Sequence, residues 1–214
     1  MKPRRSLTRT SGIRDASIIT IACEGVETEP AYFNELKFMY VTFPSRIHVE
    51  IIERKDPTLS APDHVIAMVD KEKKKNGHHP DDQYWMVIDY DRWGEDKISQ
   101  IARKAYQKDY QLAVSRPCFE TWLLLHCIPE DMLNSFKLHD NELEGCKAVE
   151  SMLRKIRRHY RKDLNDASEY VDQIDIAIRN AKLLDSSLND RWPQSFGSRV
   201  YLLCETIINQ TRLS

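Results

Sequence analysis

The chain has 214 residues, of which 41% are hydrophobic and 30% are charged, and its formal net charge is −1. This balance is typical of a globular protein and excludes a chain that is disordered throughout. It also means that no overall positive field marks a nucleic-acid-binding protein. No segment approaches the ~18 consecutive apolar residues of a membrane helix, and no apolar signal segment follows the basic start of the chain. We therefore expect a cytoplasmic protein without a membrane segment.

The five cysteines are widely spaced and form no Cys-x-x-Cys pair. This spacing gives little support to a zinc site or a disulfide framework. We expect reduced thiols that are mostly buried.

The chain begins with residues 1–14, which contain basic residues but no acid and are expected to form a flexible arm. Short β-branched segments then alternate with amphipathic segments of helical period, a pattern that predicts an α/β fold with a parallel sheet of four strands. The expected strands are residues 17–23, 47–53, 84–88 and 110–114, and the expected helices between them are residues 29–40, 63–75 and 95–108.

The remainder of the chain is expected to be helical. Residues 119–127 form a very apolar segment, and helical patterns follow over residues 141–160, 167–185 and 196–209. We therefore expect an α/β core over residues 15–128 and a helical extension over residues 129–214 that packs on it.

Carboxylates gather where two of the expected strands end. Asp89 and Asp91 follow the strand 84–88, and Glu24 follows the strand 17–23. Because the carboxyl ends of parallel strands meet at one edge of a sheet, these acids are expected to lie together, and period 2 along a strand would place Asp89 and Asp91 on one face. Such a cluster would repel itself unless a hard cation neutralised it. The pattern predicts a Mg²⁺ or Mn²⁺ site that acts on phosphates.

Further acids near these strands admit two interpretations. Glu27 and Glu29 lie at the start of a helix, where carboxylates are favoured by the helix dipole even without a metal. Glu120 is expected in the first turn of its helix, near the end of the fourth strand, either as a ligand or as a group that orients a basic side chain. His126, later in the same helix, is more consistent with a buried or capping histidine.

Several basic residues are candidates for contact with nucleic-acid phosphates. Arg92, Ser115 and Arg116 lie next to the predicted acidic edge, although Arg92 also suits a surface ion pair. In the basic run 154–162, four arginines have helical spacing and would form one cationic face, which equally suits a solvated helix. They are Arg154, Arg157, Arg158 and Arg161.

Three groups of residues together resemble the RloB-like family. They are Cys23-Glu24-Gly25 with Thr28-Glu29-Pro30 and Tyr32-Phe33; Asp89-x-Asp91 with Trp93; and Ser115-x-Pro117-Cys118-Phe119-Glu120-x-Trp122-Leu123-Leu124-x-His126. That family is similar to Toprim domains, so the resemblance implies a Toprim-like sheet with an acidic metal site. It also implies a role in bacterial phage defence, with genes near restriction systems or paired with an ATPase.

The resemblance assigns roles to individual acids. Glu24 would act as general base or metal ligand, and Asp89 and Asp91 would bind the metal. Toprim domains commonly have an acid three residues after the Glu-Gly pair, whereas this chain reads Glu-Gly-Val-Glu-Thr-Glu. Whether Glu27 or Glu29 joins the metal ligands is therefore open.

Two functions from different classes follow. The first is a Mg²⁺-dependent nuclease that hydrolyses DNA or RNA, with water as nucleophile and Glu24 as its base. The second is a non-catalytic adaptor that partners an ATPase or a restriction complex. A phosphotransferase is less well supported, because none of the six glycines forms a phosphate-binding loop. Whether the protein forms a homo-oligomer is left open.

Overall fold

The computed structural model describes residues 16–42, 45–54, 61–77, 79–133, 145–185 and 189–212. Its centre is a sheet of five strands in the order β2-β1-β3-β4-β5, in which only the pairing of β4 with β5 is antiparallel. The strands are β1 (Ser17–Cys23), β2 (Ile47–Ile52), β3 (Gln83–Asp89), β4 (Gln111–Arg116) and β5 (Gly197–Ser198).

The strand sequences explain their central position. β1 and β3 are almost continuously apolar and buried, as expected of strands that are covered on both faces. They are paired in parallel with Cys23 opposite Val87, and β3 is paired with β4 with Asp89 opposite Ser115. The carboxyl ends of β1, β3 and β4 therefore lie at one edge of the sheet.

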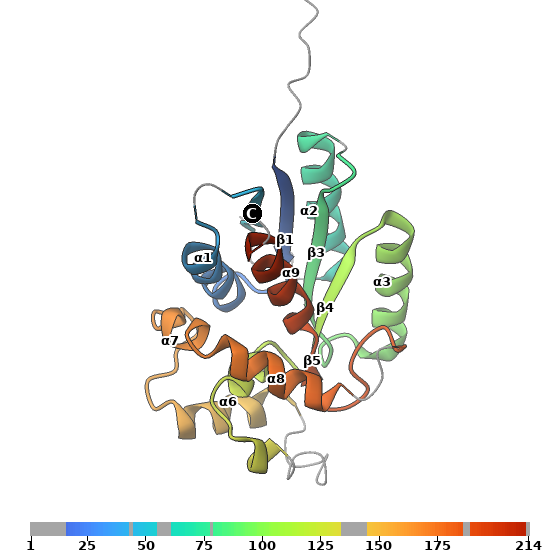
Figure 1. Cartoon of the computed structure of the whole chain (residues 1–214). Helices are drawn as coiled ribbons and strands as arrows, with labels where there is room; N and C mark the ends of the chain where they lie inside the picture. Colours follow the sequence, from blue (N-terminus) through green and yellow to red (C-terminus); the bar gives the residue numbers. More distant parts are fainter. Residues whose placement is uncertain are drawn as a thin grey trace, which may run out of the picture.

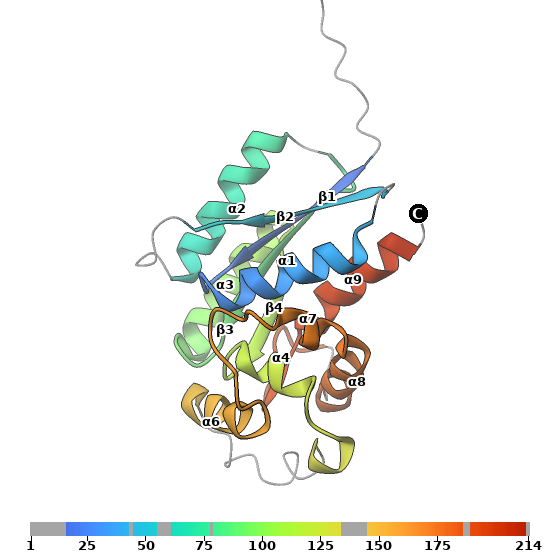
Figure 2. The same cartoon turned by 90° about the vertical axis from the view of Figure 1, so that its left-hand side faces the viewer.

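Helices cover both faces of the sheet (Figures 1 and 2). One apolar core joins the sheet to α2 and α3, and a second core joins the opposite face to the remaining helices. Helices α6, α7 and α8 gather near the carboxyl ends of the strands (Figure 1). The helices are α1 (Thr28–Tyr40), α2 (Pro62–Asn76), α3 (Gly94–Lys108), α4 (Glu120–Leu125), α6 (Cys146–Ile156), α7 (Ala167–Val171), α8 (Ile174–Leu184) and α9 (Val200–Arg212).

The predicted α/β class, with a mostly parallel sheet and a helical C-terminal part, is confirmed. The prediction of four strands was wrong, because the two-residue strand β5 is too short to leave a pattern in the sequence. No helix in the described part of the chain is long and apolar enough to span a bilayer. The arm predicted for residues 1–14 lies outside the described residues.

Two of the predicted C-terminal helices are shorter than expected. The helix predicted over 167–185 is divided into α7 and α8, because α7 packs on α1 whereas α8 packs on α4. The helix predicted over 141–160 ends at Ile156, and the chain then turns so that the ring of Tyr160 is buried in the core. Residues 157–166 form an irregular segment, called here the strap.

Candidate active site

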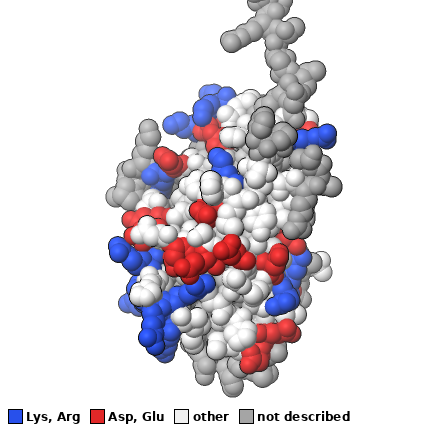
Figure 3. All heavy atoms as spheres, turned by 60° about the vertical axis from the view of Figure 1, so that its left-hand side comes forward, with Lys and Arg blue, Asp and Glu red and all other residues white. Residues whose placement is uncertain are grey.

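A pocket of about 390 Å³ opens where β3 ends and where α1, α4 and α6 begin. It lies at the sheet edge where ligands of open parallel sheets commonly bind. Figure 3 shows acidic side chains in a band across this side of the molecule, with basic side chains gathered beside it. The acidic and basic side chains that line the pocket are Glu27, Glu29, Asp89, Arg92, Glu120, Glu150 and Lys162, and two cysteines, Cys118 and Cys146, line it as well.

Glu24 is held beside Asp89, as the strand pattern predicted. One Glu24 carboxylate oxygen accepts a hydrogen bond from the Asp89 backbone N–H at 3.2 Å. The Trp93 indole N–H donates to the same carboxylate at 3.0 Å, and the Arg92 guanidinium lies 3.3 Å away. The side chain is only 2% exposed, and burial raises its pKa despite these partners. Glu24 therefore holds the end of β3 in place from behind the pocket wall.

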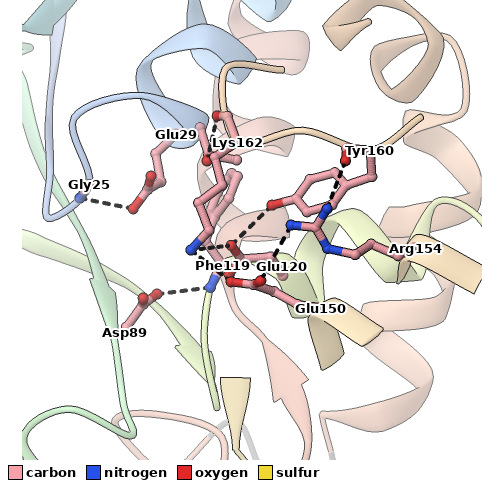
Figure 4. Close-up of polar contacts among 10 residues, drawn as sticks. Gly25, Glu29, Asp89, Phe119, Glu120, Glu150, Arg154, Tyr160 and Lys162 are labelled. Atoms are coloured by element: carbon pink, nitrogen blue, oxygen red, sulfur yellow. Dashed lines mark hydrogen bonds and ion pairs between the residues drawn. The ribbon is translucent and has the colours of Figure 1, made fainter. Parts of the chain in front are cut away.

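Asp89 is the last residue of β3 and faces into the pocket (Figure 4). Its carboxylate accepts a hydrogen bond from the Phe119 backbone N–H at 2.8 Å, at the start of α4. Burial raises the pKa of Asp89 well above its usual range, and the negative charges of Glu29, Glu24 and Glu120 raise it further. Its environment therefore favours either a proton or a bound cation.

Glu29 reaches the pocket from the first turn of α1. Its carboxylate accepts a hydrogen bond from the Gly25 backbone N–H at 2.9 Å, and its side chain is 6% exposed. Burial, together with the charges of Glu120 and Glu24, raises its pKa to about 7. A methyl group at position 25 would lie 1.9 Å from a Glu29 oxygen, so the glycine is needed for this close approach.

Glu120 and Lys162 form the opposite wall. The Tyr160 hydroxyl donates to Glu120 at 3.0 Å, and the Lys162 ammonium lies 3.8 Å from the same oxygen and 2.7 Å from Glu150 (Figure 4). The Thr28 hydroxyl donates to the Lys162 carbonyl at 2.8 Å and so ties the strap to α1. Glu120 thus orients a lysine, which is one of the two roles considered for it.

Lys162 was missed in the sequence. It belongs to the basic run 154–162, but the helical spacing of the arginines drew attention away from it. Only the fold brings it to Glu120, which is far away in the chain.

The described residues contain no group of three histidines, cysteines or acids that is arranged to hold an ion by itself. The residues nevertheless fit a hard cation in charge and chemistry, because burial and the charges of neighbouring acids disfavour the ionised forms of Glu29 and Asp89 in one pocket. Mg²⁺ commonly uses one or two carboxylates and completes its shell with water and substrate phosphate. The site therefore suits an ion that is held jointly with a substrate.

The expectation that Asp91 shares a strand face with Asp89 was wrong. β3 ends at Asp89, and the chain then turns, with the Asp91 backbone N–H donating to the Pro117 carbonyl at 3.1 Å. Asp91 is exposed and is not part of the pocket lining. Glu27 is exposed at the pocket mouth, because it precedes the first turn of α1.

The basic candidates beside the sheet edge have different surroundings. Arg92 lines the pocket and pairs with Glu24, whereas Ser115 is 1% exposed and shares a 2.8 Å hydrogen bond with the Ser198 hydroxyl. The Arg116 guanidinium stacks over the Tyr90 ring at 4.2 Å. Of these three candidates, Arg92 alone reaches the pocket.

The predicted cationic helix face does not form, because α6 ends before three of its four arginines. Arg157 pairs with Glu169 at 2.6 Å and Arg161 with Asp163 at 3.2 Å, while Arg154 remains on α6. Arg158 is exposed on the strap and lines a separate hollow with Arg157 and Arg161.

His126 is a core residue. Its ring shares hydrogen bonds with the Tyr32 hydroxyl at 3.1 Å and the Trp122 carbonyl at 2.8 Å. Burial lowers its pKa to about 3. The interpretation as a buried histidine is therefore confirmed.

Comparison with known proteins gives one match. The sequence profile of the family described as RloB-like protein matches residues 19–207, which include most of β1, the pocket and most of α9. No curated protein and no solved structure is significantly similar to the chain. The match covers nearly the whole chain, and the protein therefore belongs to the RloB-like family.

Proposed function

We propose that the protein is a Mg²⁺- or Mn²⁺-dependent nuclease that hydrolyses phosphodiester bonds of DNA or RNA in bacterial phage defence. The observation that carries this proposal is the set of buried acids around one open pocket, with a lysine on the opposite wall. The resemblance to Toprim domains supports the same reaction, because an acid follows the first strand and another ends the third. The cytoplasm is the proposed location.

The residues of the pocket would have different roles in catalysis. Asp89 and Glu29 face the position where a cation would be held, and Glu24 fixes Asp89 through its backbone. A bound Mg²⁺ would lower the pKa of the attacking water and neutralise phosphate charge. Glu29 faces the same pocket and would accept the proton of that water. This assigns to Glu29 the role of base that the family resemblance gives to Glu24.

Lys162 would act on the phosphate. Its ammonium is held by Glu120 and Glu150 at the pocket wall, opposite Asp89. A fixed positive charge beside a reacting phosphate stabilises the charge that develops on its oxygens. Arg92, at the mouth, would contact a neighbouring phosphate.

The proposal is tested by incubating purified protein with single- and double-stranded DNA and with RNA, in Mg²⁺, Mn²⁺ or EDTA. We expect metal-dependent cleavage that Asp89→Asn and Glu29→Gln each reduce by about 100-fold or more. The matched control is Glu95→Gln, an exposed acid in the first turn of α3 outside the pocket, which should retain activity. Cleavage that survives Asp89→Asn unchanged would contradict the proposal.

A non-catalytic adaptor is the second candidate, and the ion pairs of the site favour it. Glu24 is already paired with Arg92, and Glu150 with Lys162, so part of the negative charge is neutralised within the chain. An adaptor of a partner ATPase would show no cleavage with any metal, and Asp89→Asn would leave its association with the ATPase unchanged.

A further inference from the structure

The outer face of α6 carries basic residues that the proposed nuclease site does not use. Lys147, Arg154 and Lys155 line a shallow hollow of about 390 Å³ together with Ser151. The spacing of i, i+4, i+7 and i+8 places these four residues on one side of the helix. The opposite side, with Val149 and Leu153, is buried in the core.

This hollow adjoins the acidic pocket at Glu150. Glu150 lines both, and it is the residue that holds Lys162 at 2.7 Å. A chain that enters the pocket would therefore meet the basic face of α6 next. Figure 3 shows basic side chains gathered beside the acidic band on this face of the molecule.

The two lysines of this face differ from its one arginine in their partners. Arg154 lies 3.7 Å from Glu150 and donates to the Tyr160 carbonyl at 3.3 Å. Lys147 and Lys155 are exposed, and within the described ranges neither has a carboxylate within 4.0 Å. No carboxylate of these parts of the chain thus neutralises their charges, which suits the binding of an anion.

The dimensions fit the backbone of one nucleic-acid strand. Lys147 and Lys155 are eight residues apart, which corresponds to about 12 Å along the helix axis. A stacked strand has one phosphate per about 3.4 Å of axial rise, so this distance corresponds to about three to four steps between phosphates. The hydroxyl of Ser151 lies between the two charges and offers a donor to a phosphate oxygen.

We propose that the α6 track, defined as Lys147, Ser151, Arg154 and Lys155, binds the phosphates of a single nucleic-acid strand adjacent to the scissile phosphate. This inference rests on the proposed nuclease function for the strand that enters the pocket. It replaces the cationic stripe 154–161 expected from the sequence, because the strap arginines Arg157 and Arg161 are paired with acids.

The test measures binding of a short fluorescein-labelled single strand, as DNA and as RNA, by anisotropy in EDTA over a range of KCl concentrations. We expect Lys147→Gln/Lys155→Gln to weaken binding and to reduce the slope of log affinity against log salt by about 1.4, or about 0.7 for each lost contact. The matched control is Lys71→Gln/Lys74→Gln on α2, which removes the same charge on the opposite face of the sheet. It should leave the slope unchanged.

The outcomes separate this inference from the nuclease proposal. If the α6 double variant and the α2 control have the same slope while Asp89→Asn abolishes cleavage, the track is refuted and the nuclease proposal stands. If the track variant loses binding but no metal supports cleavage, the track stands and the nuclease proposal falls. If the wild-type protein binds no single strand, the track is refuted.

Discussion

Substituting Glu29 by glutamine should stabilise the protein at neutral and alkaline pH when no metal is present. The pKa of Glu29 is raised from its ordinary value of 4.5 to about 7 by burial and by neighbouring acids. A carboxyl with a raised pKa in the folded state contributes stability that is present below about pH 4.5 and is lost as the pH rises through about 7. Glutamine is neutral at every pH and can still accept the hydrogen bond from Gly25.

The magnitude follows from the size of the shift. A rise from 4.5 to about 7 corresponds to about 3 kcal/mol between the two protonation states. We therefore expect Glu29→Gln to match the wild type near about pH 4.5 and to exceed its free energy of unfolding by about 3 kcal/mol near about pH 8. The difference between the two proteins reports the ionisation of Glu29 together with the effect of its charge on the pKa of Asp89, whereas distant titrating groups are common to both.

The assay is urea unfolding in EDTA, followed by circular dichroism across this pH range. Repeating it with Mg²⁺ tests the link to the cation, since an ion at 100 times its dissociation constant would stabilise the wild type by about 2.7 kcal/mol. Mg²⁺ should increase the free energy of unfolding of Glu29→Gln by less than that of the wild type. A wild type and variant whose difference in stability does not change with pH would refute the reasoning that Glu29 is forced to ionise in a crowded acidic pocket.

Three further predictions concern other residues. Gly25→Ala should destabilise the protein by about 1–3 kcal/mol through displacement of Glu29, and the same change in a Glu29→Ala background should cost much less in a double-mutant cycle. In single-turnover kinetics, Lys162→Met should lower the rate constant of cleavage by about 100-fold, whereas Lys162→Arg should retain part of the wild-type rate because it keeps the positive charge. Equal rates for Lys162→Met and the wild type would exclude a role for the ammonium. The pKa of His126 is lowered to about 3 in the folded protein, so its neutral form contributes stability that is lost as the pH falls from about 6.5 towards about 3. The free energy of unfolding of His126→Gln should therefore depend less on pH between these values than that of the wild type.

The sequence predicted the sheet edge because the information there is local. β1 and β3 are apolar runs that end at acids, and parallel pairing alone brings Glu24 beside Asp89. The same local pattern failed for Asp91, because a turn anchored by the Pro117 carbonyl interrupts the alternation.

Lys162 could not be predicted from such patterns. It reaches the pocket because the strap leaves α6, buries Tyr160 and is tied to α1 by a hydrogen bond between residues 134 positions apart. β5 likewise depends on tertiary pairing with β4 and has only two residues. Long-range packing, rather than periodicity, decides both features.

The most direct test of the cation site is Mn²⁺ binding at about pH 8, measured by electron paramagnetic resonance of the free ion. Asp89 and Glu29 line one pocket in which burial and neighbouring acids disfavour their charged forms, so a divalent ion should bind there and each carboxylate should contribute. We predict saturable binding by the wild-type protein and by Glu95→Gln, with a large loss of affinity in Asp89→Asn/Glu29→Gln. Equal Mn²⁺ affinity in all three proteins would contradict the assignment of the pocket as a metal site.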